Sequence, residues 1–430
     1  MCQGYTPARP PLPGEEGQRE EFPWQLGAID AHCHPTDTMA SMASVPTMRA
    51  RILTIMATRS QDQDLVARVA AQHSFSDRAA LATPPTEGST VTDKIVPAFG
   101  WHPWFSHQLY DDTPEGNNTY DASLASTSEG EKGKQKAKHY SAVLSGSPDS
   151  AFIASLPEPI SLRGFLAETR RRLVEFPLAL IGEVGLDKGF RLPVPWAEEE
   201  YAKRDQSQTP GGRENRALTK HHVDPDHQVG ILKAQLRLAG EIGRAVSIHG
   251  VQGHGVLFDA LSSLWKGYEN EVLSKRQQRR IAPGAEDFSD FSSDESDGED
   301  LEVVDKSSQP YQPKPFPPRI CLHSFSADGG WVKRYMRPEI PARTYFSFST
   351  EVNLIGPNEA KSQAMEEKFA QVIKACPDDR ILLESDLHVA GQEMDYFLEH
   401  IYRKVCIIKG WTLQKGVEQI RKNYEQFLFG

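Results

Sequence analysis

Cysteine is scarce in this chain: its five cysteines are scattered over 430 residues without any Cys-x-x-Cys pair. Disulfide frameworks and cysteine zinc motifs both use closely spaced cysteines, so neither is expected. No run approaches the ~18 apolar residues that a membrane-spanning helix needs, and residues 1–21 lack the apolar centre of a secretory signal. These absences predict an intracellular protein, cytoplasmic or nuclear or both, with no membrane partner.

An excess of positive charge is also missing. The formal net charge is −11, and the stretch 286–305, which has ten acids and no base, accounts for nearly all of it. Long-range attraction would therefore not draw the chain onto nucleic acid, and any nucleic-acid chemistry would depend on local contacts and metal. The serines beside acids in this stretch fit either a kinase-regulated interaction segment or an inert solvated loop.

What the chain does contain is a series of short apolar or β-branched runs, mostly followed by helical patterns. Runs that are apolar on both faces are typical of parallel strands covered by helices. The strand candidates are residues 28–34, 51–58, 95–101, 178–186, 245–249, 319–325, 343–349 and 381–386. Helical patterns occupy residues 62–73, 227–244, 253–265, 328–336, 359–376, 393–410 and 413–430. This alternation predicts an α/β fold, a TIM (β/α)8 barrel.

Polar segments interrupt the barrel pattern. Residues 1–22 are rich in proline, glycine and charge and predict a flexible tail, which leaves 23–430 as the barrel domain. Insertions at about 110–150, 191–226 and 268–317 are dominated by small, charged and turn-forming residues. Such compositions bury too little apolar surface to offset the entropy of ordering, so we expect long, disordered loops.

Histidines and acids gather at the ends of the predicted strands. His32 and His34 lie two apart at the end of the first strand, so they project from the same face. Active sites of such barrels form at the carboxyl ends of the strands. Strands four, five, six and eight end, in that order, in Glu183, His249, His323 and Asp386.

Taken singly, each of these residues has an ordinary structural explanation. The histidines at 249 and 323 could be core residues, Glu183 an ion-pair partner and Asp386 a helix cap. Their joint placement favours metal binding instead. Six protein ligands are too many for one catalytic zinc, whereas two ions ~3.5–4 Å apart that share a carboxylate would use them all. Such a pair makes an activated water available at neutral pH.

At these residues the chain resembles the TatD-related deoxyribonucleases, which are metallo-dependent hydrolases. The resemblance rests on DAHCH (30–34), GWHPW (100–104), GEVGLD (182–187), SIHG (247–250), HSFS (323–326), ESD (384–386) and KNYEQFLFG (422–430). These motifs follow the family order over about residues 28–430. HCHPTDTM (32–39) and HGVQGHG (249–255) are similar to the fungal branch named cut-nine-interacting proteins.

The resemblance implies a role for each matching residue. His32, His34 and Asp386 would hold a first ion, a second ion would be held by His249 and His323, and Glu183 would bridge. Glu183 and Asp386 would be catalytic, with Asp386 accepting a proton from the attacking water. The implied cofactors are two divalent ions, with magnesium usual in the family, whereas histidine-rich ligation favours zinc, manganese or cobalt. The implied reaction is hydrolysis of phosphodiesters in DNA.

Three departures from the family pattern leave these ligands intact but put the substrate contacts in doubt, above all those to phosphate. Pro35 follows the second histidine, where leucine is frequent. Leu387 and His388 replace a small residue and proline after the last aspartate. Gly250 stands where an arginine often follows the fifth-strand histidine.

Other residues at the predicted mouth carry weaker signals. His102 and Asp187 are expected to contact substrate or to orient a ligand histidine. Trp101 and Trp104 would stack on a base or pack in the core. Lys188 and Arg191 would either contact a phosphate or lie on a solvated face. The remaining histidines nearby are expected to be ordinary loop or helix residues: His221, His222, His227 and His254.

Two other functions stay open. One is a different metal-barrel enzyme, such as a deaminase, a lactonase or a hydrolase of an ester outside nucleic acid. Many of these use a modified lysine on strand four, where this chain has Glu183. The second is an interaction or scaffold protein of the cell-cycle machinery that retains a metal site, as the name of the fungal branch suggests. The residues do not separate DNA from RNA or from another ester.

Overall fold

The computed structural model describes residues 20–83, 93–272 and 311–430. The acidic stretch 286–305 and most of the predicted tail lie outside these ranges. Within them, eight parallel strands form one sheet in the order in which they occur along the chain. The strands are β1 (Ile29–Cys33), β2 (Ile52–Met56), β3 (Ile95–Phe99), β6 (Leu180–Asp187), β7 (Val246–Val251), β8 (Arg319–Leu322), β9 (Arg343–Phe348) and β10 (Ile381–Leu383). All eight predicted strands are present.

The sheet is closed by contacts between β1 and the segment that follows β10. The backbone N–H of Asp386 donates to the carbonyl of His32 (3.1 Å), and that of His34 donates to the carbonyl of Leu387 (2.8 Å). The N–H of Ser385 donates to the Asp30 carboxylate (3.0 Å). The fold is therefore the predicted TIM barrel, and its closure brings the first and last predicted ligand positions together.

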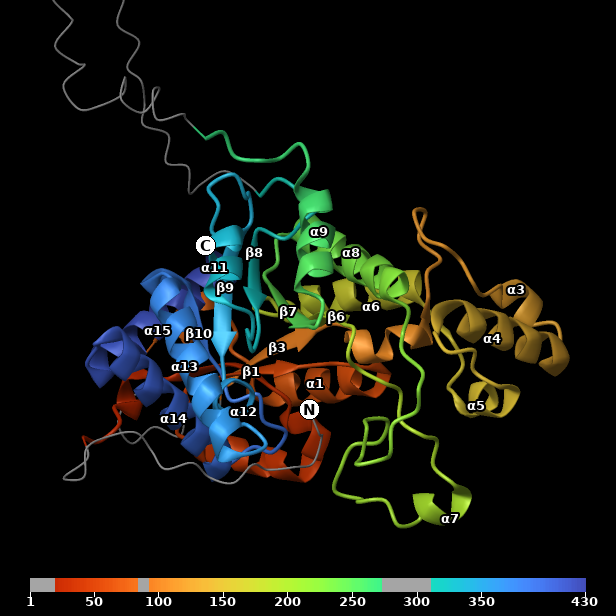
Figure 1. The fold of residues 1–430 in the computed structure, drawn as a ribbon, viewed down its shortest axis with the longest axis horizontal. Helices are drawn as coiled ribbons and strands as arrows, with labels where there is room; N and C mark the ends of the chain where they lie inside the picture. The colour runs from red at the N-terminus through yellow and green to blue at the C-terminus, as the bar shows by residue number, and fades with distance from the viewer. Residues whose placement is uncertain (1–19, 84–92, 273–310) are drawn as a thin grey trace, which may run out of the picture.

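Helices surround the barrel (Figure 1). Their apolar faces are buried against the strands; in α15, for example, Val417, Ile420 and Tyr424 recur at helical spacing and are fully buried. The principal helices are α1 (Ser60–His73), α6 (Leu162–Glu175), α8 (Pro225–Ile242), α9 (His254–Trp265), α11 (Gly329–Tyr335), α13 (Glu359–Ala375), α14 (Gln392–Lys409) and α15 (Leu413–Phe429). Shorter elements are α2 (Arg78–Ala82), α12 (Thr350–Leu354) and the 3-10 segments η1 (Trp24–Leu26), η2 (Pro35–Thr47), η3 (Pro103–Gln108) and η6 (Asp378–Arg380).

The insertion at 110–150 is ordered, and the expectation of a disordered loop is wrong here. With its neighbours it forms β4 (Leu109–Tyr110), α3 (Ala122–Ala125), α4 (Glu129–Val143), α5 (Ser150–Ser155) and β5 (Ile160–Ser161). Figure 1 shows α3, α4 and α5 together at one side of the barrel. α4 and α5 share a core that includes Tyr140, Val143 and Phe152, which are each at most 8% exposed, whereas Ala125 of α3 packs in a separate cluster. A few apolar residues at helical spacing suffice to dock these helices, although the composition of the segment is polar.

The insertion at 191–226 contains only one short helix, α7 (Glu198–Tyr201), but it too is held in place. The N–H of Leu192 donates to the carbonyl of His221 (2.9 Å), and the N–H of Thr209 donates to the carbonyl of Asp37 (2.8 Å). Most of the insertion at 268–317 lies outside the described residues. Phe22, assigned to the tail from the sequence, is 3% exposed and packs on Trp24. No helix among the described residues has the length and apolar character to cross a bilayer.

Candidate metal centre

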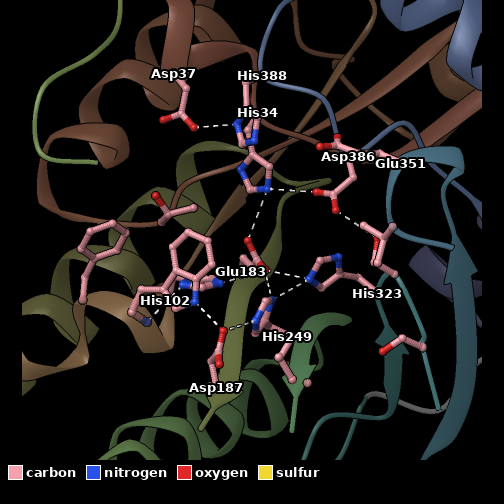
Figure 2. Close-up of a pocket in the computed structure, with 18 residues that line it drawn as sticks. His34, Asp37, His102, Glu183, Asp187, His249, His323, Glu351, Asp386 and His388 are labelled. Carbon is pink, nitrogen blue, oxygen red and sulfur yellow. Dashed lines mark hydrogen bonds and ion pairs between the residues drawn. The ribbon is translucent and has the colours of Figure 1, made fainter. Parts of the chain in front are cut away.

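All six predicted ligands converge at the carboxyl ends of the barrel strands. Three of them lie on β1, β6 and β7 (His32, Glu183 and His249), and the other three follow the ends of β1, β8 and β10 (His34, His323 and Asp386). Five of the six line one cavity of about 200 Å³, and the sixth, His32, is fully buried beneath it. Figure 2 shows Glu183 at the centre of this cavity with the histidines around it.

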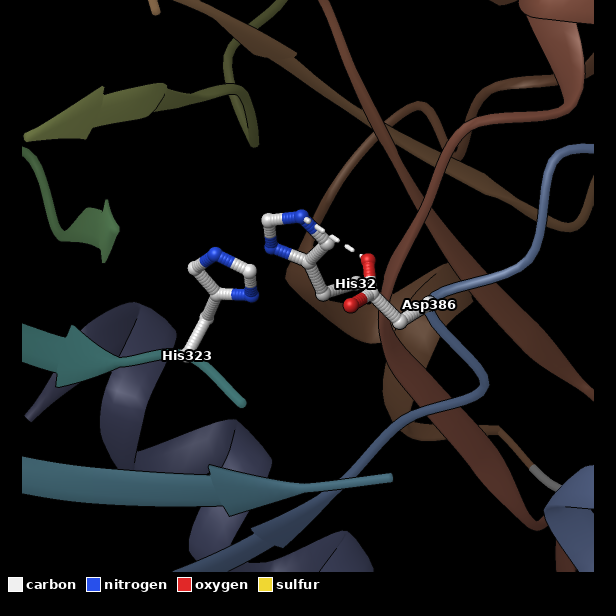
Figure 3. Close-up of side chains that lie close together, drawn as sticks. All are labelled: His32, His323 and Asp386. Carbon is white, nitrogen blue, oxygen red and sulfur yellow. Dashed lines mark ion pairs between the residues drawn. The ribbon is translucent and has the colours of Figure 1, made fainter. Parts of the chain in front are cut away.

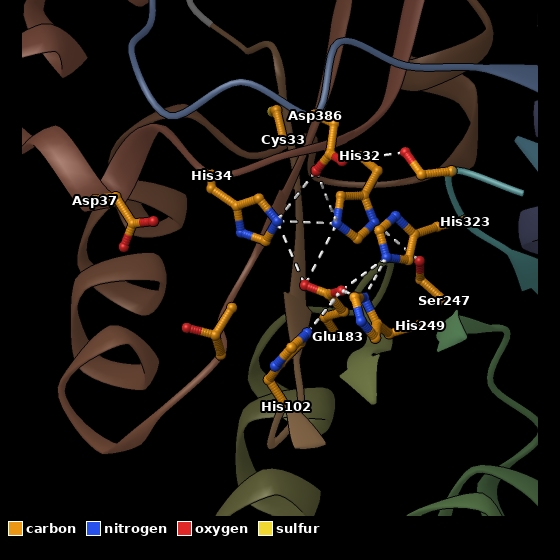
Figure 4. A network of polar contacts seen from close by, with 12 residues as sticks. His32, Cys33, His34, Asp37, His102, Glu183, Ser247, His249, His323 and Asp386 are labelled. Atoms are coloured by element: carbon orange, nitrogen blue, oxygen red, sulfur yellow. Dashed lines mark hydrogen bonds and ion pairs between the residues drawn. The ribbon is translucent and has the colours of Figure 1, made fainter. Parts of the chain in front are cut away.

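One group of ligand atoms surrounds Oε2 of Glu183. Nε2 of His32 lies 3.5 Å from this oxygen and Nε2 of His34 lies 3.4 Å from it, while the two nitrogens are 3.0 Å apart. Oδ1 of Asp386 lies 3.9 Å from the first nitrogen and 3.6 Å from the second. Figure 4 shows these side chains directed toward one another from β1, β6 and the end of β10.

A second group surrounds the other oxygen of the same carboxylate. Oε1 of Glu183 lies 2.8 Å from Nδ1 of His249, 2.7 Å from Nε2 of His323 and 3.1 Å from Nε2 of His102. The nitrogens of His249 and His323 are 3.0 Å apart. His102 was expected to contact substrate or to orient a ligand, but its ring nitrogen is placed among the ligand atoms themselves.

The two groups are not fully separate. Figure 3 shows His323 beside His32 and Asp386. The two imidazole rings are stacked at 3.9 Å with an interplanar angle of 6°. One ligand atom from each of these three residues falls within 4.8 Å of the others, so His323 lies at the boundary between the two groups.

The chemistry of these atoms fits divalent cations. Ligand atoms about 2.1 Å from one tetrahedral ion lie roughly 3.4 Å from one another, and the separations between ligand atoms in the first group run from 3.0 to 3.9 Å. Burial would by itself raise the pKa of Glu183, but the imidazoles of His102, His323 and His32 lower it well below the usual range. Five imidazoles and two carboxylates in a buried cluster thus form residue groups that could bind metal.

Further polar groups hold the ligand histidines in place. Nε2 of His249 lies 3.2 Å from Oδ2 of Asp187, which also accepts the indole N–H of Trp104 (2.6 Å). The Asp187 contact leaves the other ring nitrogen of His249 facing Glu183. Nδ1 of His32 lies 3.0 Å from the hydroxyl of Ser247.

Asp386 is positioned by residues that follow β8 and β10. Oδ2 of Asp386 accepts from the Ser324 hydroxyl (3.1 Å), and Glu384 accepts from the N–H of Ser324 (2.7 Å). Asp386 itself adopts a left-handed backbone conformation, with φ of 60°. Burial raises the pKa of its carboxyl group. The side chain therefore faces the cluster from a largely buried position.

Sequence reasoning missed one polar chain at the mouth. Nδ1 of His388 lies 2.8 Å from Oδ2 of Asp37, and Oδ1 of the same carboxylate accepts from Arg59 (3.1 Å). The His388 ring stacks on that of His34 at 5.3 Å. Glu351, at the start of α12, also lines the cavity, and burial raises its pKa to about 7. Asp37 lies in the HCHPTDTM segment and His388 follows the ESD motif, but the sequence indicates neither their pairing nor the entry of Glu351 into the cavity.

The other residues predicted at the mouth differ in whether they line the cavity. Trp101 is 2% exposed and packs in a core cluster with Phe165, as the core alternative required. Trp104, by contrast, lines the cavity. Lys188 and Arg191 are exposed and do not line it. The four histidines expected to be ordinary loop or helix residues, His221, His222, His227 and His254, are also absent from its lining.

Comparisons with known proteins agree with this geometry. The family model described as TatD related DNase matches residues 29–429. The chain is 34% identical to the Cut9-interacting protein scn1 of Schizosaccharomyces pombe, over 93% of this chain and 98% of that protein. It is 23% identical to a Saccharomyces cerevisiae protein described as an uncharacterized deoxyribonuclease, with the same two shares covered.

Among solved structures, an uncharacterized amidohydrolase from Saccharomyces cerevisiae is 11% identical, with a TM-score of 0.49, over 93% of this chain and 99% of that chain. A TatD family hydrolase from Entamoeba histolytica is also 11% identical, with a TM-score of 0.47, over 93% and 97%. The match of the family model over nearly the whole chain and the identity to the Schizosaccharomyces protein are sufficient: this chain belongs to the TatD-related DNase family of hydrolases.

Proposed function

We propose that the protein is a two-metal hydrolase that cleaves phosphodiester bonds, with DNA as its substrate. The observation that carries the proposal is the position of Glu183, whose two carboxylate oxygens face two different groups of ligand atoms. A carboxylate shared in this way is what a pair of neighbouring divalent ions requires.

In this proposal each ion has its own residues. His32, His34 and Asp386 would hold one ion, His249 and His323 the other, and Glu183 would bridge them. His102 is a further candidate ligand for the second ion, because its nitrogen lies 3.1 Å from the bridging carboxylate. When bound, magnesium, manganese or zinc would supply an activated water and offset the charge that develops on the phosphate.

The protein's own groups would position the reaction and move one proton. Asp386 would accept the proton of the attacking water, with Ser324 and Glu384 fixing its orientation. Asp187 would keep His249 in the tautomer that binds metal. Burial of the cluster keeps competing water away from the ligand atoms, which strengthens their interactions with charge.

The choice of a phosphodiester rests on the family description and on the Saccharomyces relative described as a deoxyribonuclease. The test is turnover by purified protein that has been stripped with a chelator and then reloaded with magnesium, manganese or zinc. We expect metal-dependent cleavage of single-stranded DNA. RNA, a small phosphodiester and a carboxylic ester distinguish the other hydrolase functions. Absence of metal-dependent cleavage across the phosphodiesters would contradict the proposal.

A second candidate function is protein binding, and it is favoured by one observation only. The Schizosaccharomyces relative is named for its interaction with Cut9, and the match covers 98% of that relative. A scaffold would bind its partner equally well with and without metal. If the protein is inert toward every ester and binds a Cut9-type partner after chelation, the scaffold function replaces the enzymatic one.

A further inference from the structure

A second cavity adjoins the metal cavity and has no part in the site described so far. Its volume is about 440 Å³, and it shares Trp104 and Phe105 with the lining of the metal cavity. Its other walls come from residues 59–61, 107–108, 155–160 and 190–216, so the insertion at 191–226 provides much of its surface. We call this cavity the insertion groove. Binding sites for small ligands commonly have volumes of ~300–1,000 Å³.

The lining of the insertion groove combines aromatic rings with positive charge. Trp104 stacks on Phe190 at 4.5 Å with an angle of 10°. Trp196 and Tyr201 add two more rings, and the tyrosine is 51% exposed. Three arginines and one glutamate line the groove, with no lysine or aspartate. Arg59 is ion-paired with Asp37 and Asp62, whereas Arg216 is a cationic group that lies against an aromatic ring of the groove.

The wall of the groove is held to the barrel by hydrogen bonds. The Gln61 side chain, on α1, donates to the carbonyl of Pro210 (2.6 Å), and the Thr209 hydroxyl donates to the carbonyl of Thr36 (2.6 Å). Arg216 donates to the carbonyl of Val194 (3.2 Å), and its guanidinium lies 5.5 Å from the centre of the Trp196 ring. The aromatic and cationic groups are therefore in place before any ligand arrives.

We propose that the insertion groove binds the nucleotide next to the phosphate that is cleaved, with Trp196 as a base-stacking residue that selects nucleic-acid strands over small esters. This inference rests on the proposed phosphodiesterase function. Aromatic stacking with neighbouring arginines is the usual way in which proteins bind single strands without reading their sequence. The insertion groove is connected to the metal cavity through Trp104. The indole N–H of this residue donates to Asp187, which contacts His249.

A nucleotide fits the groove better than a peptide does. A base can lie on the flat aromatic surfaces while its phosphate faces the guanidinium of Arg216, whereas an apolar peptide would use neither the ring faces for stacking nor the positive charge. The position of the groove beside a hydrolytic site also requires an occupant that continues from the bond being cleaved. A small diester such as methyl p-nitrophenyl phosphate would occupy the metal cavity without reaching Trp196.

The test compares a single-stranded DNA oligonucleotide with methyl p-nitrophenyl phosphate on the metal-loaded full chain. For Trp196→Ala we expect the KM for the oligonucleotide to rise about tenfold, as loss of one stacked base would give, with little change in kcat. Its kcat/KM for the small diester should match that of the wild type. Trp196→Phe should retain most of the oligonucleotide affinity. The control is Tyr268→Ala, an exposed aromatic residue outside both cavities.

Each outcome decides the inference. If Trp196→Ala and the wild type bind and cleave the oligonucleotide equally, the groove is not a nucleotide subsite, although the proposed function stands. If the variant loses activity equally on both substrates, Trp196 has a structural role and the inference is wrong. If the wild type cleaves neither phosphodiester with any of the metals, the proposed function fails and the inference fails with it.

Discussion

At the scale of single residues, the centre depends on groups that are not themselves ligands. Asp187 is the clearest case, because it contacts His249 and Trp104 at the same time. For Asp187→Asn we expect the affinity for the second ion to fall about 10- to 100-fold, the usual cost of losing such a partner. Calorimetric titration of the stripped protein with manganese measures this directly. Asp259→Asn, a change at an exposed position on α9, is the control. Equal affinity in the two variants would mean that Asp187 does not orient His249.

Much of the candidate centre follows from the sequence, because strands of known direction place their last residues at one end of a barrel. That reasoning brings together His32, His34, Glu183 and the three later ligands. It does not foresee that His388 reaches Asp37, or that Glu351 enters the cavity. These residues lie in loops and short helices whose paths depend on tertiary packing, and no period of two or 3.6 residues marks them.

At the scale of elements, buried histidines on α4 of the helical insertion (residues 110–150) and on the adjoining η3 should make this region sensitive to acid. Burial lowers the pKa of His107 to about 3 and that of His139 to about 4. Each is therefore neutral in the folded state at pH values where the unfolded chain, with a pKa near 6.5, already binds a proton. Stability from these residues is present above about pH 6.5 and is lost as the pH falls toward 4.

The measurement is the melting temperature between pH 7 and pH 4.5 for the wild type and for His139→Gln. The wild-type His139 ring contacts the Thr119 hydroxyl (2.7 Å) and the carbonyl of His107 (2.8 Å), and glutamine offers a similar donor and acceptor. We expect the variant to lose less stability on acidification. An identical pH profile would show that this histidine does not titrate with unfolding.

The strands could be predicted from the sequence, whereas the helices of the insertion at 110–150 could not, because their hydrophobic patterns differ in strength. Strands such as β2 and β3 are continuous apolar runs and are buried at every position. In α4, by contrast, the buried residues are Gln135, His139, Tyr140 and Val143. Only the tyrosine and the valine among these four are hydrophobic. Helical spacing of mixed residues within a polar segment gives a weak signal, and the docking of the helix supplies the rest.

The C-terminal helix α15 should contribute strongly to the stability of the barrel. Phe427 is 1% exposed, and its ring lies 5.4 Å from that of Tyr345 on β9. Phe427→Ala should lower the free energy of unfolding by about 3–5 kcal/mol, because it removes a large buried side chain. Denaturant unfolding compares it with Ile407→Ala, where the side chain is 61% exposed and the change should be within about 0.5 kcal/mol. Similar losses in both variants would contradict the packing described for α15.

At the scale of the whole molecule, most of the net negative charge lies in one stretch of sequence outside the segments that form the barrel strands. The stretch 286–305 has ten acids, no base and few apolar residues, so its removal takes away most of the net charge and little that could be buried. We expect its deletion to leave the melting temperature and the metal content unchanged. A large drop in the melting temperature would show that the stretch contributes to the fold. Loss of a protein partner without loss of stability would favour the interaction function.

The two oxygens of Glu183 face two groups of ligand atoms, and Glu183→Gln is the sharpest test of the proposal that two ions share this carboxylate. Glutamine keeps the size of the side chain but removes the charge that both groups of ligands face. The measurement is metal content and turnover of single-stranded DNA, with wild type and variant reloaded side by side. We expect two ions per chain in the wild type, fewer ions in the variant, and a rate for the variant that is at least about 100-fold lower with the fold intact. A variant with the wild-type rate and metal content would contradict the proposal.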